Sequence, residues 1–422
     1  MKKISLIIVL LFLTSCTDKK GPPLKGDRMN VLHYELSRKT SKVKANLPKA
    51  TNLHTWKISD DNQFTNIPSN LKLSPKLQML QKISPSDFNP STNDSAIIII
   101  NDIIYTYTKS TLSAYNISLE KRLWSAIVPA KNEVKDNIGG SIAYDNGVVY
   151  VSSGTRDFVA YNAESGKEQW RYRAPNVIRY IPLIQNKQIY INSIDNTLFC
   201  INFSGKLLWS YDAPVYTLTS SHLYQPNIEY DNKLVSITTA GDLLVLNRYD
   251  GEEITQVNLA MSSIIGDGSL EKGPIVSPVM DKENLYVLTG ESELMKINLA
   301  AYEISWRQNF PNAKSFWVSG NLIFLLNNNN QLIAVENENG KLVWMIDLPS
   351  TKKDEKYFGP IIGGGKIVLA SNTGDFLLVS PSDGKIISHY KSGFSTNRMP
   401  LILNEKIYFI GSNGKIMIWG DK

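Results

Sequence analysis

The sequence predicts an all-β protein, an eight-bladed β-propeller of four-stranded blades whose last blade is closed by an N-terminal strand. An apolar doublet recurs along the chain at intervals of 38 to 51 residues, and this spacing with short strands is typical of propeller blades. The eighth unit also lacks a fourth strand, because the chain ends at Lys422. The eight doublets are Ile104-Tyr105, Val149-Tyr150, Ile189-Tyr190, Leu234-Val235, Leu285-Tyr286, Ile323-Phe324, Ile367-Val368 and Ile407-Tyr408.

The first strand of a unit often follows a proline, which lacks an N–H and therefore suits the first residue of a strand. These prolines are Pro182, Pro226, Pro278, Pro360 and Pro400. The second strand carries the doublet, whose β-branched and aromatic residues favour a packed, pleated surface.

After the third strand, a turn contains glycine at positions 166, 205, 251, 340 and 384. The fourth strand often carries a tryptophan four residues after this glycine, as at Trp170, Trp209 and Trp344. Trp124 and Trp306 hold the same place without the glycine. Because a large ring buries much area, we expect these tryptophans to cover the gaps between blades.

The strand missing from the eighth unit is assigned to residues 54–58, which contain Trp56. This strand would complete the last blade and leave only short, protected sheet edges. Two alternatives stay open at this point. One is an open solenoid, and the other is a seven-bladed ring with a degenerate first unit.

The N-terminus is predicted to lie outside the propeller. Residues 1–15 have the basic start and short apolar stretch of a secretory signal peptide. Leu13-Thr14-Ser15-Cys16 resembles a bacterial lipobox, which implies a lipidated Cys16; an ordinary signal peptide is the alternative. Residues 16–50 are predicted to be a flexible basic tether, and residues 51–422 the propeller. Since Thr17 rather than Asp follows the cysteine, the resemblance to lipoproteins implies an outer-membrane location.

The sequence gives no sign of catalytic, metal or cofactor-binding residues. Its four histidines lack metal-ligand spacing, and Cys200 is predicted to be a buried apolar residue. The segment from Gly363 to Lys366 is predicted to be a turn between strands rather than a phosphate loop. Residues 51–422 carry no basic excess, which argues against nucleic-acid binding.

Two resemblances bear on function. The segment from Tyr161 to Trp170 resembles the tryptophan-docking repeat of quinoproteins, which implies a PQQ-binding periplasmic oxidoreductase as one alternative. The chain lacks the adjacent cysteines that many of those enzymes carry. Lipobox, tether, closing strand and repeats together resemble the BamB family. That resemblance implies a non-enzymatic scaffold, monomeric within a hetero-complex, that docks on the POTRA domains of a BamA-type insertase beside other assembly lipoproteins.

Two loops between blades, residues 212–225 and 262–277, are long and apolar, so we expect them to form a contact site. In the BamB family a Leu-x-Leu-Arg run on the first loop grips the partner; here the run is Tyr216-Thr217-Leu218-Thr219, without the arginine. Packing over the blade tops and binding of another envelope client are the alternatives. The predicted partner-binding residues are Tyr216, Leu218, Thr219, Ile264, Ile265 and Leu270.

Overall fold

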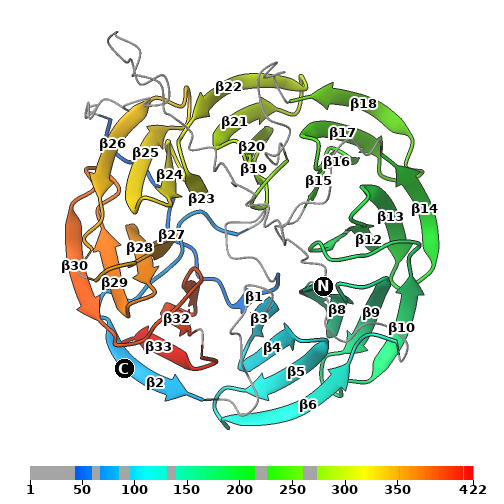
Figure 1. Ribbon diagram of the computed structural model, residues 1–422, viewed down its shortest axis with the longest axis horizontal. Helices are drawn as coiled ribbons and strands as arrows, with labels where there is room; N and C mark the ends of the chain where they lie inside the picture. The colour runs from blue at the N-terminus through cyan, green and yellow to red at the C-terminus, as the bar shows by residue number, and fades with distance from the viewer. Residues whose placement is uncertain are drawn as a thin grey trace, which may run out of the picture. The chain divides into compact units, whose positions relative to one another are not determined.

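The computed structural model describes residues 43–58, 67–84, 96–130, 139–213, 226–259, 273–350, 352–411 and 413–421. All of them belong to one compact unit, Arg38–Lys422. Their strands form eight antiparallel sheets set around a common centre (Figure 1). The predicted eight-bladed, all-β propeller is confirmed.

Each blade is numbered in chain order, and its strands run from the centre outward. Blade 1 contains β3 (Ala96–Ile100), β4 (Ile103–Thr108), β5 (Thr111–Asn116) and β6 (Lys121–Ile127), with β1 (Thr55–Trp56) beside β3. Blade 2 contains β7 (Ser141–Asp145), β8 (Val148–Ser152), β9 (Asp157–Asn162) and β10 (Glu168–Arg173). Blade 3 contains β11 (Leu183–Gln185), β12 (Gln188–Asn192), β13 (Thr197–Asn202) and β14 (Leu207–Asp212). Blade 4 contains β15 (Asn227–Tyr230), β16 (Lys233–Ile237), β17 (Asp242–Asn247) and β18 (Glu253–Asn258).

The remaining blades repeat this order. Blade 5 contains β19 (Val279–Asp281), β20 (Asn284–Leu288), β21 (Glu293–Asn298) and β22 (Glu303–Asn309). Blade 6 contains β23 (Ala313–Ser319), β24 (Leu322–Asn327), β25 (Gln331–Glu336) and β26 (Leu342–Asp347). Blade 7 contains β27 (Tyr357–Gly363), β28 (Lys366–Ser371), β29 (Asp375–Val379) and β30 (Ile386–Lys391). Blade 8 contains β31 (Leu401–Leu403), β32 (Lys406–Ile410), β33 (Ile416–Gly420) and β2 (Gln78–Ile83).

All eight apolar doublets lie in the second strands of their blades, as predicted. Four of the five prolines come immediately before the first strand of a blade, but Pro360 does not. It lies inside β27, where the pairing register shifts between Phe358 and Ile361. A register shift tolerates proline because the ladder is interrupted there.

The last blade is closed by an N-terminal strand, as predicted, but the assignment of that strand to residues 54–58 is wrong. The strand that pairs with β33 is β2 (Gln78–Ile83), with Ile83 opposite Ile416. Thr55 and Trp56 instead pair with the innermost strand of blade 1, opposite Ile100 and Ile99. Trp56 is fully buried there, because it packs into the core rather than on an outer strand.

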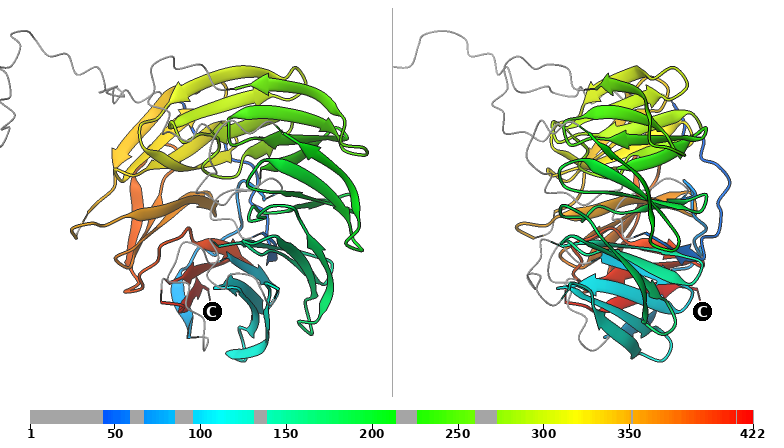
Figure 2. Two further views of the ribbon diagram at one scale, coloured as in Figure 1. Left: turned by 45° about the vertical axis from the view of Figure 1, so that its right-hand side comes forward. Right: turned by 90° about the vertical axis from the view of Figure 1, so that its right-hand side faces the viewer.

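Residues 43–58 and 67–77, here called the strap, cross one face of the propeller from blade 6 to blade 2. In blade 6, Asn321 accepts a hydrogen bond from Asn46 N–H at 2.7 Å. In blade 7, Ile362 O accepts one from Leu71 N–H at 3.0 Å. In blade 2, Tyr144 N–H donates to Lys57 O of the strap at 2.9 Å. Figure 2 shows this blue segment along one side of the propeller. The contacts of residues 43–50 show that part of the predicted tether lies on the propeller.

Five tryptophans join neighbouring blades. Each lies on an outer strand just after a register shift and donates its indole N–H to a carbonyl in the next blade at 2.9 to 3.1 Å. The ring also rests on the turn glycine of that blade; a Cβ on Gly166 would lie 2.4 Å from the Trp124 ring. The pairs are Trp124 with Gly166, Trp170 with Gly205, Trp209 with Gly251, Trp306 with Gly340 and Trp344 with Gly384.

Where the tryptophan is missing, the facing turn has no glycine. In blade 4 the tryptophan position is occupied by Thr255, and the facing turn of blade 5 has Tyr302 in place of glycine. In blade 8 the position is occupied by Gln81, and the facing turn of blade 1 has Glu120. Gln81 donates to the Glu120 carboxylate at 3.4 Å. Between blades 7 and 8, Trp419 packs edge-on against Phe376, with 4.9 Å between ring centroids. Tryptophan and glycine are therefore matched across each gap rather than within one repeat.

Candidate partner-binding face

The connections from one blade to the next all emerge on the face opposite the strap, here called the loop face. Neighbouring strands are antiparallel, so the turns from first to second and third to fourth strand lie on the strap face. The turns from second to third strand and the inter-blade connections lie on the loop face. Cys16 and all six predicted partner-binding residues lie outside the described residues. Their roles therefore stay predictions.

The described ends of the second predicted loop are fixed by close contacts. Leu259 N–H donates to Gly241 O at 3.2 Å where the second loop leaves blade 4. Where that loop returns, a Cβ on Gly273 would lie 2.9 Å from the Thr239 backbone. Thr239 in turn accepts a hydrogen bond from Asn196 of blade 3 at 3.0 Å. The frame that carries these loops is thus held across blades 3, 4 and 5.

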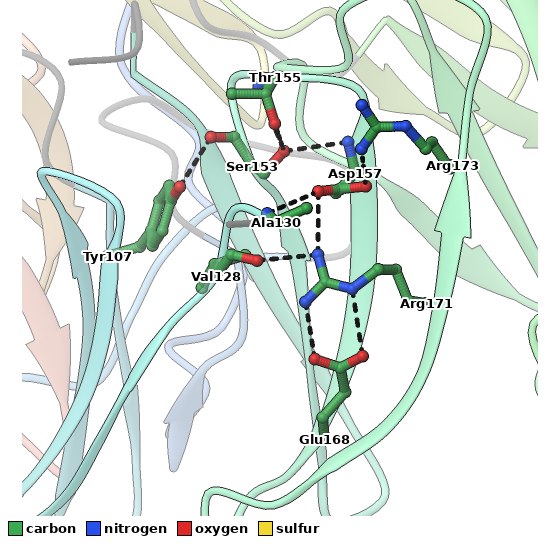
Figure 3. Close-up of polar contacts among 9 residues, drawn as sticks. All are labelled: Tyr107, Val128, Ala130, Ser153, Thr155, Asp157, Glu168, Arg171 and Arg173. Carbon is green, nitrogen blue, oxygen red and sulfur yellow. Dashed lines mark hydrogen bonds and ion pairs between the residues drawn. The ribbon is translucent and has the colours of Figure 1, made fainter. Parts of the chain in front are cut away.

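A buried carboxylate organises the loop face between blades 1 and 2 (Figure 3). Asp157, at the start of β9, is wholly buried; it accepts a hydrogen bond from Arg173 and forms an ion pair with Arg171, each at 3.0 Å. It also accepts from Ala130 N–H at 3.1 Å, in the connection from blade 1 to blade 2. Three donors surround this carboxylate, so it holds the connection in place rather than acting as a base.

Arg171 extends the network toward the strap face. Its guanidinium donates to Val128 O at 2.8 Å and to both oxygens of Glu168, at 2.6 and 3.1 Å. Burial lowers the pKa of Arg171, but its hydrogen bond to Glu168 and the charges of Glu168 and Asp157 outweigh that effect and raise it. Sequence reasoning missed this network. Asp157 meets the arginines only through the register of β9 and β10, which no local motif reveals.

Replacing Asp157 with alanine should lower the free energy of unfolding by roughly 2 kcal/mol, because it removes one buried partner of each guanidinium and the acceptor of the Ala130 N–H. The partial exposure of both arginines limits the loss. Chemical denaturation measures it. Asp145→Ala in the same blade is the control, and an equal effect of both variants would contradict the network's role.

Lys314, at the loop-face end of blade 6, is held against blade 7. Its ammonium donates to Tyr357 O at 2.8 Å and lies 5.1 Å from the centre of the Phe358 ring. Burial, together with the nearby charge of Lys356, lowers the pKa of Lys314 to about 8. The folded protein therefore releases this proton at lower pH than the unfolded chain does.

This difference predicts a pH dependence of stability. Between about pH 8 and pH 10 the unfolded chain binds more protons at Lys314, so the contribution of this residue to stability should rise with pH by roughly 1 to 2 kcal/mol. Lys314→Met should remove that rise while leaving the rest of the profile unchanged. Denaturation of both proteins at several pH values tests this. Equal slopes would show that Lys314 is not buried as described.

The described residues offer little for metal or cofactor chemistry. They contain no group of three His, Cys, Asp or Glu side chains that could hold a metal ion. Cys200 is buried as predicted, and burial raises the pKa of its thiol to about 12. Gly364 and Gly365 form the turn between β27 and β28. No helix of the described residues has the length and apolar character of a membrane span.

Comparison with known proteins identifies the family. The family model described as outer membrane protein assembly factor BamB matches residues 108–346 and 263–421. The chain belongs to the BamB family. It is 30% identical over 342 residues to the uncharacterized protein RC0314 of Rickettsia conorii, covering 77% of this chain and 80% of that protein. It is 20% identical over 319 residues to BamB of Yersinia pestis, covering 73% and 79%.

Solved structures show the same fold. BamB from Moraxella catarrhalis superposes with a TM-score of 0.66 at 14% identity, covering 82% of this chain and all of that one. A europium-containing methanol dehydrogenase superposes with a TM-score of 0.59 at 12% identity, covering 84% and 89%. The propeller is therefore shared by BamB proteins and by dehydrogenases, and the fold alone does not separate them.

Proposed function

We propose that this protein is a non-enzymatic scaffold lipoprotein of the outer-membrane β-barrel protein assembly machinery. The observation that carries the proposal is the BamB family match across residues 108–421 of the propeller. In this proposal Cys16 is lipidated and anchors the chain to the periplasmic face of the outer membrane. The loop face docks on the POTRA domains of a BamA-type insertase.

The fold supports a binding role through rigidity. Five Trp–Gly contacts and the strap tie the blades together, so the ends of the inter-blade connections keep fixed positions. A surface that changes little on binding loses little conformational freedom when a partner docks. Tyr216 and Leu218 are the proposed anchors, since central aromatic and apolar residues commonly dominate binding.

The alternative, a PQQ-dependent oxidoreductase, is favoured by the quinoprotein-like repeat from Tyr161 to Trp170 and by the likeness to dehydrogenase structures. Among the residues that the structure describes, no three His, Cys, Asp or Glu side chains come together at a metal-binding distance. The sequence has two cysteines, Cys16 and Cys200, which are not adjacent.

The double variant Tyr216→Ala/Leu218→Ala should recover at least about tenfold less insertase in an affinity pulldown from the native envelope, as expected for loss of two central anchors. Leu207→Ala/Leu208→Ala, on the exposed outer strand of blade 3, is the matched control. Wild-type recovery by the first variant would rule out these two residues as anchors.

A further inference from the structure

The exposed large apolar side chains of the described residues fall into two groups on the rim of the propeller. One group lies on adjacent blades 7, 8 and 1 and comprises Ile386, Ile387, Met79, Leu119, Leu123 and Ile127, each 40% to 70% exposed. The other lies on blades 3 and 4 and comprises Phe203, Leu207, Leu208, Tyr249 and Ile254. Five of the six residues in the first group lie in the strap-face half of the rim, at third-to-fourth turns or early in outer strands.

Charge distinguishes the two groups. The outer strands of blades 7, 8 and 1 contain Lys391, Lys82, Lys121 and Arg122 and no carboxylate. Lys385 and Lys76 lie just before two of these strands. The nearby carboxylates are Glu120, Asp421 just after β33, Asp383, which pairs with Lys385, and Asp375, which pairs with His389. Outer strands β14 and β18, on the other side, contain Asp212 and Glu253 and no cation, although Lys206 lies just before β14 and Arg248 beside Tyr249. We call the first group and its cations the basic rim.

The basic rim shares its face with the first described residues of the chain. The strap reaches blade 6 at Lys44, whose carbonyl accepts from Asn321 at 3.0 Å, on the same face. About 26 residues separate Cys16 from Val43, enough to span roughly 90 Å when extended. The number of residues in this link does not by itself set the orientation of the propeller at a membrane.

We propose that the basic rim of blades 7, 8 and 1 docks on an anionic phospholipid surface. Exposed Leu, Ile and Met side chains beside Lys and Arg are the combination that binds at a bilayer interface, since the apolar groups enter the headgroup region and the cations meet anionic lipids. The inference rests on the proposed anchor only for its proximity to a membrane. Docking places the strap face against the bilayer and turns the loop face away from it.

Cosedimentation of the chain from Thr17 to Lys422, which has no lipid, isolates the rim from the anchor. With vesicles of phosphatidylethanolamine containing about one quarter phosphatidylglycerol, this chain should bind, and with phosphatidylcholine vesicles it should not. Leu123→Ser/Ile386→Ser/Ile387→Ser should weaken binding at least about tenfold, since three apolar groups leave the interface. Lys76→Glu/Lys121→Glu, at two cations on the strap-face side of the rim, should weaken binding comparably at low salt, and high salt should reduce the difference from wild type.

The matched control is Leu207→Ser/Leu208→Ser/Ile254→Ser on blades 3 and 4, whose side chains are exposed to a similar degree, 38%, 46% and 47%. It should bind as wild type does, and thermal unfolding checks that all variants fold. Absence of wild-type binding, or equal loss in both triple variants, would overturn the proposal. Palmitate labelling of Cys16 is scored separately. Vesicle binding without palmitate labelling would contradict lipidation of Cys16 and support docking of the basic rim. Labelling without vesicle binding would support lipidation and contradict docking.

Discussion

Gly166→Ala should lower the free energy of unfolding by roughly 3 kcal/mol, whereas Gly147→Ala should lower it by about 1 kcal/mol. Both glycines have positive φ, 68° and 83°, so both substitutions carry the same backbone penalty. Only at Gly166 does the added methyl group collide, because its Cβ would lie 2.4 Å from the Trp124 ring, whereas a Cβ added at Gly147 would meet no atom within 4 Å.

Denaturant unfolding of the two variants measures the difference, and the double variant Trp124→Ala/Gly166→Ala identifies its cause. Once the ring is gone, adding the methyl group at position 166 should cost no more than at position 147. If the two glycine variants were equally stable, the matching of tryptophan and glycine across blades would not hold.

Ile83→Asp should destabilise the propeller by at least about 4 kcal/mol. The variant should therefore no longer show the cooperative thermal unfolding transition of the wild type. Ile83 is 1% exposed and lies opposite Ile416, so the substitution places a carboxylate inside the blade that closes the ring. Lys82→Asp, one position earlier and exposed on the same strand, is the control and should change stability by less than about 0.5 kcal/mol.

Thermal unfolding followed by circular dichroism distinguishes the variants. The result decides whether blade 8 is completed by β2 or by residues 54–58. If residues 54–58 completed blade 8, Ile83 would lie outside the core and both variants would be equally mild.

The propeller could be predicted from the sequence because its apolar doublets, turn glycines and outer tryptophans each recur at a regular spacing along the chain. The closing strand was misassigned because Trp56 suggested an outer strand, where five other tryptophans lie. At the corresponding place in β2 the chain has Gln81, which fills the gap to blade 1 by pairing with Glu120 instead. A strand that departs from the repeat at its most distinctive position cannot be recognised by that position.

The functional surfaces were predictable in unequal measure. The network at Asp157 depends on which residues of β9 and β10 face each other, and a register is fixed only by the folded sheet. The basic rim joins residues from blades 7, 8 and 1 that are far apart in the sequence and become neighbours only through ring closure. Tyr216, Leu218 and the other loop residues were chosen from composition and family resemblance, and they stay predictions.

The central claim is that this propeller works as a scaffold in outer-membrane protein assembly. Affinity capture of the detergent-solubilised protein from its own envelope, after crosslinking and with mass spectrometry, tests it most directly. The account predicts recovery of the barrel insertase and its companion lipoproteins. Recovery of the protein without the insertase, at a bait level that captures other envelope partners, would contradict the scaffold role and leave only the propeller.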